Sequence, residues 1–147
     1  MPAHKTLTVR SLVTKHKGIF QEYATVVPEK ARLFLEKLHD TDYQSHVELA
    51  LFEPQSTVDQ VEGTFFVGIL VSEQPPHPPA GMEYMEITRD YAFAKGTIDE
   101  IGELHVTLSN WMLENELQFD LTGYIIEMYF PTDKGEEVEI YLPIKTK

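Results

Sequence analysis

The sequence contains no cysteine, and this absence removes several classes of chemistry at once. None of its 147 residues carries a thiol, so the chain can form neither a disulfide nor a zinc site with thiolate ligands. Catalysis by a cysteine nucleophile is excluded for the same reason. The absence agrees with a reducing compartment, and we therefore expect a cytoplasmic protein.

Basic residues and long apolar runs are also scarce. Twelve Lys and Arg stand against 24 Asp and Glu, which gives a formal net charge of −12. Such a chain repels phosphate backbones, so we expect no direct binding to nucleic acid. The first twenty residues alternate polar and apolar and lack the apolar run of a signal peptide or a membrane span. We therefore expect no membrane association.

Sequence signatures of metal sites and cofactor sites are missing as well. The six histidines fall in no HxxxH or HxxE grouping, so we expect no metal and no cofactor. There is no GxSxG elbow and no phosphate-binding glycine loop. His105 lies within a predicted helix and is interpreted as a packing residue rather than a base.

Two segments have the apolar periodicity of amphipathic helices. The first, over residues 28–40, begins with Pro28, which suits the first position of a helix. The second, over residues 97–116, is longer and begins with a capping box of Thr97 and Glu100. Their apolar stripes comprise Ala31, Phe34, Leu35 and Leu38 in the first helix and Ile101, Leu104, Leu108, Trp111 and Met112 in the second.

Six segments rich in β-branched and aromatic residues are predicted as strands. They cover residues 7–13, 46–53, 63–71, 82–95, 124–130 and 137–144. The element order is therefore β-α-β-β, repeated twice. The proline-rich segment 74–81 cannot continue a strand ladder and reads as the connection between the repeats. We predict one α+β domain over 1–147, made of two pseudo-repeats at about 1–73 and 82–147.

The two halves can be aligned by a shift of 77 residues, which places Phe52 on Tyr129 and Ala50 on Glu127. A carboxylate in one half thus replaces a small apolar residue in the other. Two such units most simply form an antiparallel sheet with both helices on one side. The opposite surface can then curve into a groove, which we expect to be the ligand site.

Glu127 is the leading candidate for that site because it has no charged neighbour within three residues on either side. Strand alternation places it with Tyr129 and opposite Ile126 and Met128. If the face of Ile126 and Met128 meets the helices, Glu127 points into the groove. A partly buried carboxylate is costly unless it is paired, hydrogen-bonded or protonated. The alternative interpretation is an edge strand with a solvated Glu127 or one paired with a nearby Lys.

Aromatic side chains accompany this acid, and an aromatic wall beside a carboxylate suits a lipophilic cation. Cation–π attraction and a desolvated counter-charge reinforce each other in a dry site. The candidate ligand-binding residues besides Glu127 are Tyr129, Trp111, Tyr91, Phe93, Phe66 and Tyr141, within a wider set that also includes Phe52 and Phe65. Core packing is the alternative interpretation for most of them, because strand aromatics and a helix-stripe tryptophan are ordinary core residues.

Residues 91–145 resemble a known family. The segments that carry the resemblance are YAFAKGTIDEIGELHVTLSNWMLENE, YIIEMYF and EVEIYLPIK, together with FFVGILV at 65–71. They are similar to the GyrI-like superfamily, the effector-binding domain that occurs at the C-terminus of AraC-type and MerR-type multidrug-responsive regulators and also as free-standing proteins.

The resemblance implies two β-α-β-β repeats around a groove, with the family's strand glutamate at Glu127. The aromatic two places later falls on Tyr129, and the helix tryptophan falls on Trp111. In the family this glutamate faces cationic lipophilic drugs, and in some free-standing members it takes part in hydrolysing cyclopropane-containing genotoxins. The usual proline before the Tyr-Ala strand is absent from segment 87–91, and the usual Gly-Pro is Gly-Thr at 96–97. The identity of the ligand is therefore not carried over.

Three functions follow as hypotheses. The first is a free-standing protein that binds a hydrophobic or cationic organic molecule and acts by sequestration or as a partner-dependent regulator. The second is a hydrolase of cyclopropane-containing genotoxins with Glu127 as catalytic residue and with Tyr129 or Trp111 holding the substrate. The third is a protein-interaction role such as gyrase antagonism. Whether the chain forms a homodimer or has a protein partner stays open.

Overall fold

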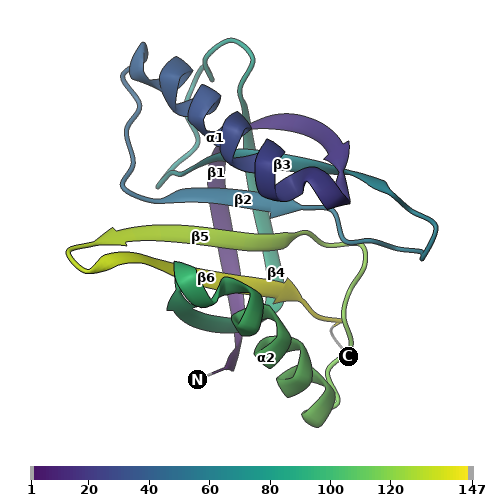
Figure 1. Cartoon of the computed structure of the whole chain (residues 1–147). Helices are drawn as coiled ribbons and strands as arrows, with labels where there is room; N and C mark the ends of the chain where they lie inside the picture. Colours follow the sequence, from purple (N-terminus) through teal and green to yellow (C-terminus); the bar gives the residue numbers. More distant parts are fainter. Residues whose placement is uncertain (1, 146–147) are drawn as a thin grey trace.

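Alternation of apolar and polar residues along six segments folds the chain into a closed antiparallel β-barrel with two helices on its outside (Figure 1). The computed structural model describes residues 2–145. The strands are β1 (Ala3–Ile19), β2 (Glu48–Phe52), β3 (Glu62–Leu70), β4 (Glu83–Thr97), β5 (Ile125–Thr132) and β6 (Gly135–Pro143). The helices are α1 (Tyr23–His39) and α2 (Ile101–Glu114), preceded by 3-10 turns at Phe20–Glu22 and Ile98–Glu100. The predicted α+β class, an antiparallel sheet with two helices, is confirmed.

The two halves of the chain have the same element order, β1-α1-β2-β3 and β4-α2-β5-β6. Around the barrel the strands follow the order β1-β3-β2-β5-β6-β4, so the halves meet where β1 pairs with β4 and where β2 pairs with β5. In the second of these seams Ala50 lies directly opposite Glu127. These two residues are also equivalent under the 77-residue shift. Because a residue pairs with its own equivalent only at a two-fold axis, the pseudo-symmetry axis passes between them.

The inside of the barrel is filled by one set of apolar side chains. Every second residue of each strand points inward, as the pleat of a strand requires. The interior core consists of Val9, Val13, Leu49, Leu51, Phe66, Tyr91, Ile126, Met128 and Tyr141, all of them buried. This core occupies the face of the sheet that lies away from the helices.

The helices cover two separate parts of the outer face. Phe34 and Leu38 of α1 pack on outward-facing residues of β1 and β3, among them Phe65. Leu108 and Met112 of α2 pack on outward-facing residues of β4 and β6. The paired strands β2 and β5 run between the two helices (Figure 1).

The position expected for the groove was wrong, and closure of the sheet is the reason. The sequence reasoning placed the groove on the face opposite the helices, with Ile126 and Met128 meeting those helices. Ile126 and Met128 instead point into the barrel, where the interior core occupies that face. Glu127 and Tyr129 therefore share the outer face with α1 and α2.

Both helices also begin differently from the prediction. Helix α1 begins at Tyr23, so Pro28 lies inside the helix and not at its first position. The hydrogen bond that a proline cannot donate is offset by packing of Tyr23 and Val26 on the barrel. Before α2, Thr97 makes no side-chain cap, and a 3-10 turn takes the place of the predicted capping box. Within residues 2–145, neither helix is long and apolar enough to cross a membrane.

Gly68 is required where β3 lies unusually close to its paired neighbour β1, opposite Val13. A Cβ at this position would lie 2.0 Å from the backbone oxygen of Leu12 and 2.8 Å from Val13. We expect Gly68→Ala to lower the free energy of unfolding by about 1–3 kcal/mol or more, because a rigid backbone must move to admit the methyl group. Chemical denaturation of both proteins measures the difference.

The matched control for that substitution is Gly102→Ala in the first turn of α2. A Cβ there meets no atom within 4 Å, and alanine is the better helix former by about 0.5–1 kcal/mol. We expect this variant to be as stable as the wild type or slightly more stable. Equal destabilisation by the two substitutions would contradict the close approach of β1 and β3 at Gly68.

Candidate functional site

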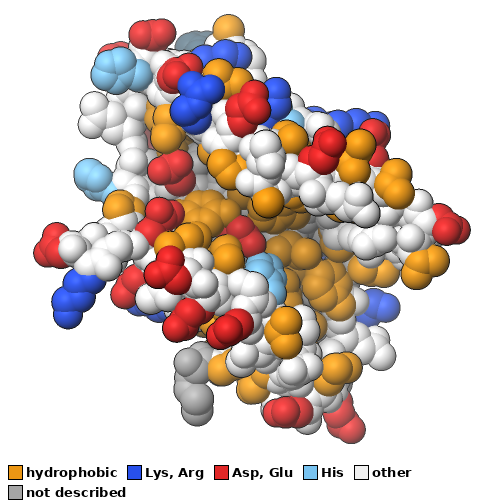
Figure 2. Space-filling model, viewed as in Figure 1, with side chains coloured by type: hydrophobic (Ala, Val, Ile, Leu, Met, Phe, Trp, Pro, Cys, Tyr) orange, Lys and Arg blue, Asp and Glu red, His pale blue; other side chains and the backbone are white. Residues whose placement is uncertain are grey.

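A deep pocket lies between α1 and α2, and its floor is the seam of β2 and β5. Its volume is about 940 Å³, at the upper end of the roughly 300–1,000 Å³ range of pockets for drug-sized molecules. Figure 2 shows this hollow crossing the molecule between the two helices, with mainly hydrophobic side chains along it. The apolar lining includes Phe20, Tyr23, Val27 and Ala31 from the α1 side, Ile98 and Ile101 from the α2 side, and Phe52 and Ile125 from the floor.

The floor is open above Glu127 because the residue opposite it is small. Ala50 on β2 pairs with Glu127 on β5, and its methyl group rises little above the sheet. Both residues point out of the barrel, since their neighbours Leu49 and Ile126 point inward. The pseudo-symmetry axis therefore emerges in the pocket, with a carboxylate on one side of it and a methyl group on the other.

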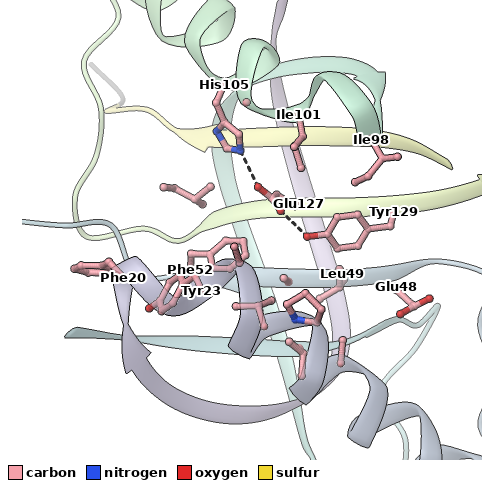
Figure 3. A pocket seen from close by; sticks show the side chains of 18 of the residues that line it. Phe20, Tyr23, Glu48, Leu49, Phe52, Ile98, Ile101, His105, Glu127 and Tyr129 are labelled. Atoms are coloured by element: carbon pink, nitrogen blue, oxygen red, sulfur yellow. Dashed lines mark hydrogen bonds and ion pairs between the residues drawn. The ribbon is translucent and has the colours of Figure 1, made fainter. Parts of the chain in front are cut away.

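Glu127 holds two hydrogen bonds in the pocket, one from each direction (Figure 3). The Nε2 atom of His105 lies 2.7 Å from its Oε2, and the hydroxyl of Tyr129 donates to its Oε1 over 2.5 Å. The side chain of Glu127 is 13% exposed and that of His105 is 31% exposed. The carboxylate is thus largely withdrawn from water but retains two donors, which makes its burial tolerable.

The phenol of Tyr129 is held in its protonated form. Burial, followed by the nearby negative charge of Glu127, raises the pKa of Tyr129 well above its usual value. Glu136 and Glu48 act on it in the same direction. Tyr129 therefore remains a hydrogen-bond donor to Glu127 at any physiological pH.

The pocket is electrostatically negative. Besides Glu127, the carboxylates of Glu48, Glu53 and Glu136 line it. Burial, and then the charge of Glu136, raise the pKa of Glu48 above its ordinary value. Among the lining residues within 2–145, Arg32 is the one Lys or Arg, and its guanidinium is already 2.7 Å from Glu36 on the exposed side of α1. A cation in the pocket would therefore meet an excess of negative charge.

Three aromatic rings form one end of the pocket. The ring of Tyr23 lies 5.4 Å from that of Phe20 and 5.8 Å from that of Phe52, measured between centroids. Among residues 2–145, the buried hydroxyl of Tyr23 has no hydrogen-bond partner, and burial raises the pKa of this phenol. The aromatic end thus offers ring faces to a ligand.

The pocket brings together only part of the residue set proposed from the sequence. Glu127 and Tyr129 line it side by side. The other five proposed residues lie elsewhere in the fold. Phe66, Tyr91 and Tyr141 belong to the interior core with Phe93 against them, and Trp111 packs in the cluster between α2 and the barrel.

Phe20, Tyr23 and His105 are among the pocket residues that the sequence reasoning missed. Phe20 and Tyr23 precede the predicted start of the first helix, so no periodicity marked them. His105 was interpreted as a packing residue, whereas the structure places its ring against Glu127. The available signal was its position one turn after Ile101, at the edge of the apolar stripe.

Comparison with known proteins gives matches in structure. No protein-family model and no curated protein sequence matches the chain. SAV2435 bound to tetraphenylphosphonium is similar with a TM-score of 0.71 and 11% identity, over 99% of this chain and 94% of that one. The EcmrR C-terminal domain is similar with a TM-score of 0.61 and 14% identity, over 100% and 98%. A hydrolase from Listeria innocua has a TM-score of 0.54 and 13% identity, over 98% and 91%.

These similarities extend over nearly the whole of each chain. The fold that the sequence resemblance implied, two β-α-β-β repeats, is therefore confirmed, and it is shared with these proteins. Identities of 11–14% establish the fold alone.

Tyr129→Phe tests the hydrogen bond to Glu127. We expect the free energy of unfolding at neutral pH to fall by about 1–3 kcal/mol, because a largely buried carboxylate loses one of its two donors. Denaturant titration measures this loss. The matched control is Tyr84→Phe, which removes a Tyr-to-Glu bond of the same i,i+2 kind at an exposed position, to Glu86. If Tyr84→Phe lowered the free energy of unfolding as much, the buried hydrogen bond would contribute no more to stability than the exposed one.

Glu48→Gln tests the cost of burying the charge of Glu48 and of its repulsion by Glu136. A raised folded-state pKa means that the folded protein binds this proton more tightly than the unfolded chain does. That contribution to stability is present below the ordinary value of 4.5 and is lost as the pH rises through the folded-state pKa. We therefore expect Glu48→Gln to stabilise the protein at neutral pH and to have no effect well below that value. Thermal unfolding at both pH values measures the difference, and destabilisation at neutral pH would contradict it.

Proposed function

We propose that this protein binds lipophilic organic cations in the pocket between α1 and α2, with Glu127 as the counter-charge. The observation that carries the proposal is a carboxylate only 13% exposed on the floor of a large apolar pocket, with no lysine or arginine bound to it among residues 2–145. A lipophilic cation gains from transfer out of water through its apolar surface and from attraction to this acid. A small hydrated cation would gain only the second of these and would lose its hydration.

The aromatic end of the pocket supports the same ligand class. The faces of Phe20, Tyr23 and Phe52 can receive the rings of a ligand whose charge lies toward Glu127 (Figure 3). The volume of about 940 Å³ accepts a bulky molecule. A protein of the same fold, SAV2435, has been observed bound to tetraphenylphosphonium, a cation of this kind.

The proposed biological role follows from the binding of such a ligand. We infer that the protein holds such molecules in the cytoplasm, either to sequester them or to signal their presence to a partner protein. The pocket does not depend on one exact ligand, because its wall consists mainly of apolar side chains that contact through dispersion forces. Selection acts on charge, bulk and apolarity, so several unrelated cations can share the site.

Hydrolysis is a second candidate function, and the contacts of Glu127 favour it over other enzymatic activities. His105 and Glu127 form a pair that could take a proton from a water molecule. The Listeria innocua protein of the same fold is described as a hydrolase.

Glu127→Gln tests the proposed function. We expect its affinity for tetraphenylphosphonium to fall by about 2–4 kcal/mol, because the variant removes a desolvated counter-charge. Binding of triphenylphosphine oxide, a neutral molecule with similar rings, should change far less. Isothermal titration calorimetry measures both ligands.

The matched control for this experiment is Glu139→Gln, which also removes a carboxylate that accepts a hydrogen bond from a tyrosine two residues away. Glu139 does not line the pocket, so its variant should bind both ligands as the wild type does. Equal losses for the cation and the neutral molecule in Glu127→Gln would mean that this residue shapes the pocket and does not recognise charge. Many turnovers of a cyclopropane-bearing alkylating agent by the wild type, and none by Glu127→Gln, would favour the hydrolase instead.

A further inference from the structure

The contact between His105 and Glu127 determines the net charge that a ligand meets in the pocket. A lipophilic cation needs Glu127 as an uncompensated anion, but the carboxylate already faces an imidazole whose Nε2 lies 2.7 Å away. If that imidazole carries a proton on each nitrogen, the pocket holds an internal ion pair. A lipophilic cation would then be repelled by the protonated imidazole that lies beside the carboxylate.

We propose that His105 is the residue that selects ligands by charge, and that a lipophilic cation binds in exchange for one proton released from its imidazole. The inference rests on the proposed function and specifies its mechanism. With the imidazole neutral, the pocket accepts permanent cations such as quaternary phosphonium and ammonium compounds. With the imidazole protonated, it favours uncharged lipophilic molecules.

The geometry allows this exchange without rearranging Glu127. A neutral imidazole that keeps its hydrogen on Nε2 still donates to Oε2, so the contact survives in both states. The proton that leaves is the one on Nδ1, which has no hydrogen-bond partner among residues 2–145. Since the side chain is 31% exposed, that nitrogen can exchange its proton with water at the pocket wall.

The other ionisable groups around His105 cannot replace it in this role. Tyr129, on β5, stays protonated and keeps Oε1 of Glu127 occupied. Glu48 and Glu53 on the β2 side and Glu136 on β6 are anions that favour a cation at neutral pH. From α1 across the pocket, Arg32 keeps its charge at every pH and is bound to Glu36. His105 is therefore the one histidine that lines the pocket among residues 2–145, and histidine is the side-chain type that exchanges a proton near neutral pH.

The test measures the affinity for tetraphenylphosphonium between about pH 6 and about pH 8.5, where histidines exchange protons. This probe carries a permanent charge and has no proton of its own to exchange. Wild-type affinity should rise with pH, by up to about tenfold per pH unit where one proton is released for each cation bound. Tetraphenylborate, an anion with the same four phenyl groups, should show no such rise.

Two substitutions fix the charge of residue 105 in its two forms. His105→Gln keeps a neutral donor for Glu127, so we expect tight binding with little change over this pH range. His105→Lys keeps a positive charge, so we expect weak binding throughout. His77→Gln is the matched control, because His77 is exposed in a loop that does not line the pocket, and it should behave as the wild type.

Calorimetry of the wild type in buffers of different ionisation enthalpy counts the protons directly. We expect up to about one proton released per cation in the wild type and none in His105→Gln. Any contribution of Glu48, whose pKa is raised by burial and by the charge of Glu136, would persist in His105→Gln and disappear in the double variant with Glu48→Gln.

The outcomes separate this inference from the proposed function. If the wild type bound tetraphenylphosphonium equally well across the range, or if His105→Gln kept the full pH dependence, the role of His105 would be wrong and the cation site would stand. If neither the wild type nor His105→Gln bound the cation at about pH 8.5, the proposed function itself would fail, and the exchange with it.

Discussion

Closure of six strands into one barrel is the constraint on which the rest of the structure depends. A closed sheet has a single inner face, and here the apolar side chains of the strands fill the space inside it. The outer face must be protected by the helices, and two helices reach only the β1–β3 and β4–β6 regions. The seam of β2 and β5 is left between them, so the pocket is a consequence of how little outer surface two helices can cover.

The pseudo-symmetry gives this uncovered seam its chemistry. At the axis a strand residue faces its own equivalent, and two identical large residues there would fill the space between the helices. Ala50 and Glu127 break the symmetry at that point. The small residue leaves room, and the acid supplies charge within it. His105 has no counterpart that could reach from α1, where Pro28 and Val27 line the facing wall, so the polar network belongs to one half only.

Much of the fold could be read from the sequence because its determinants are local. Six runs of β-branched residues and two apolar stripes fix the order of the elements. Glu127 could be found as an isolated charge in an apolar strand, and alternation placed Tyr129 beside it. Alternation separates the two faces of a strand, but it does not show which of them becomes the inside of a closed barrel. For that reason Tyr91 and Tyr141, which alternate as regularly as Tyr129, were grouped with the pocket although they lie in the interior core.

The remaining site residues depend on tertiary placement. Phe20 and Tyr23 reach the pocket because a 3-10 turn redirects the chain between β1 and α1, and no periodicity in the sequence reports that turn. The role of His105 depends on the distance between α2 and β5, which the packing of Leu108 and Met112 determines. Contacts between a helix and a strand that are far apart in the chain depend on the packing of the whole core. They leave no local pattern in the sequence.

The two walls of the pocket belong to different halves of the chain, since α1 comes from the first repeat and α2 from the second. A molecule that fills the pocket is therefore a non-covalent bridge between the repeats, and it exists only while both are folded against each other. Binding adds to the free energy of unfolding in proportion to the logarithm of one plus the ratio of the free ligand concentration to the dissociation constant. In a cell that degrades opened chains, more of the protein would survive when its ligand is abundant. The quantity of binder would then follow the quantity of ligand without any change in synthesis.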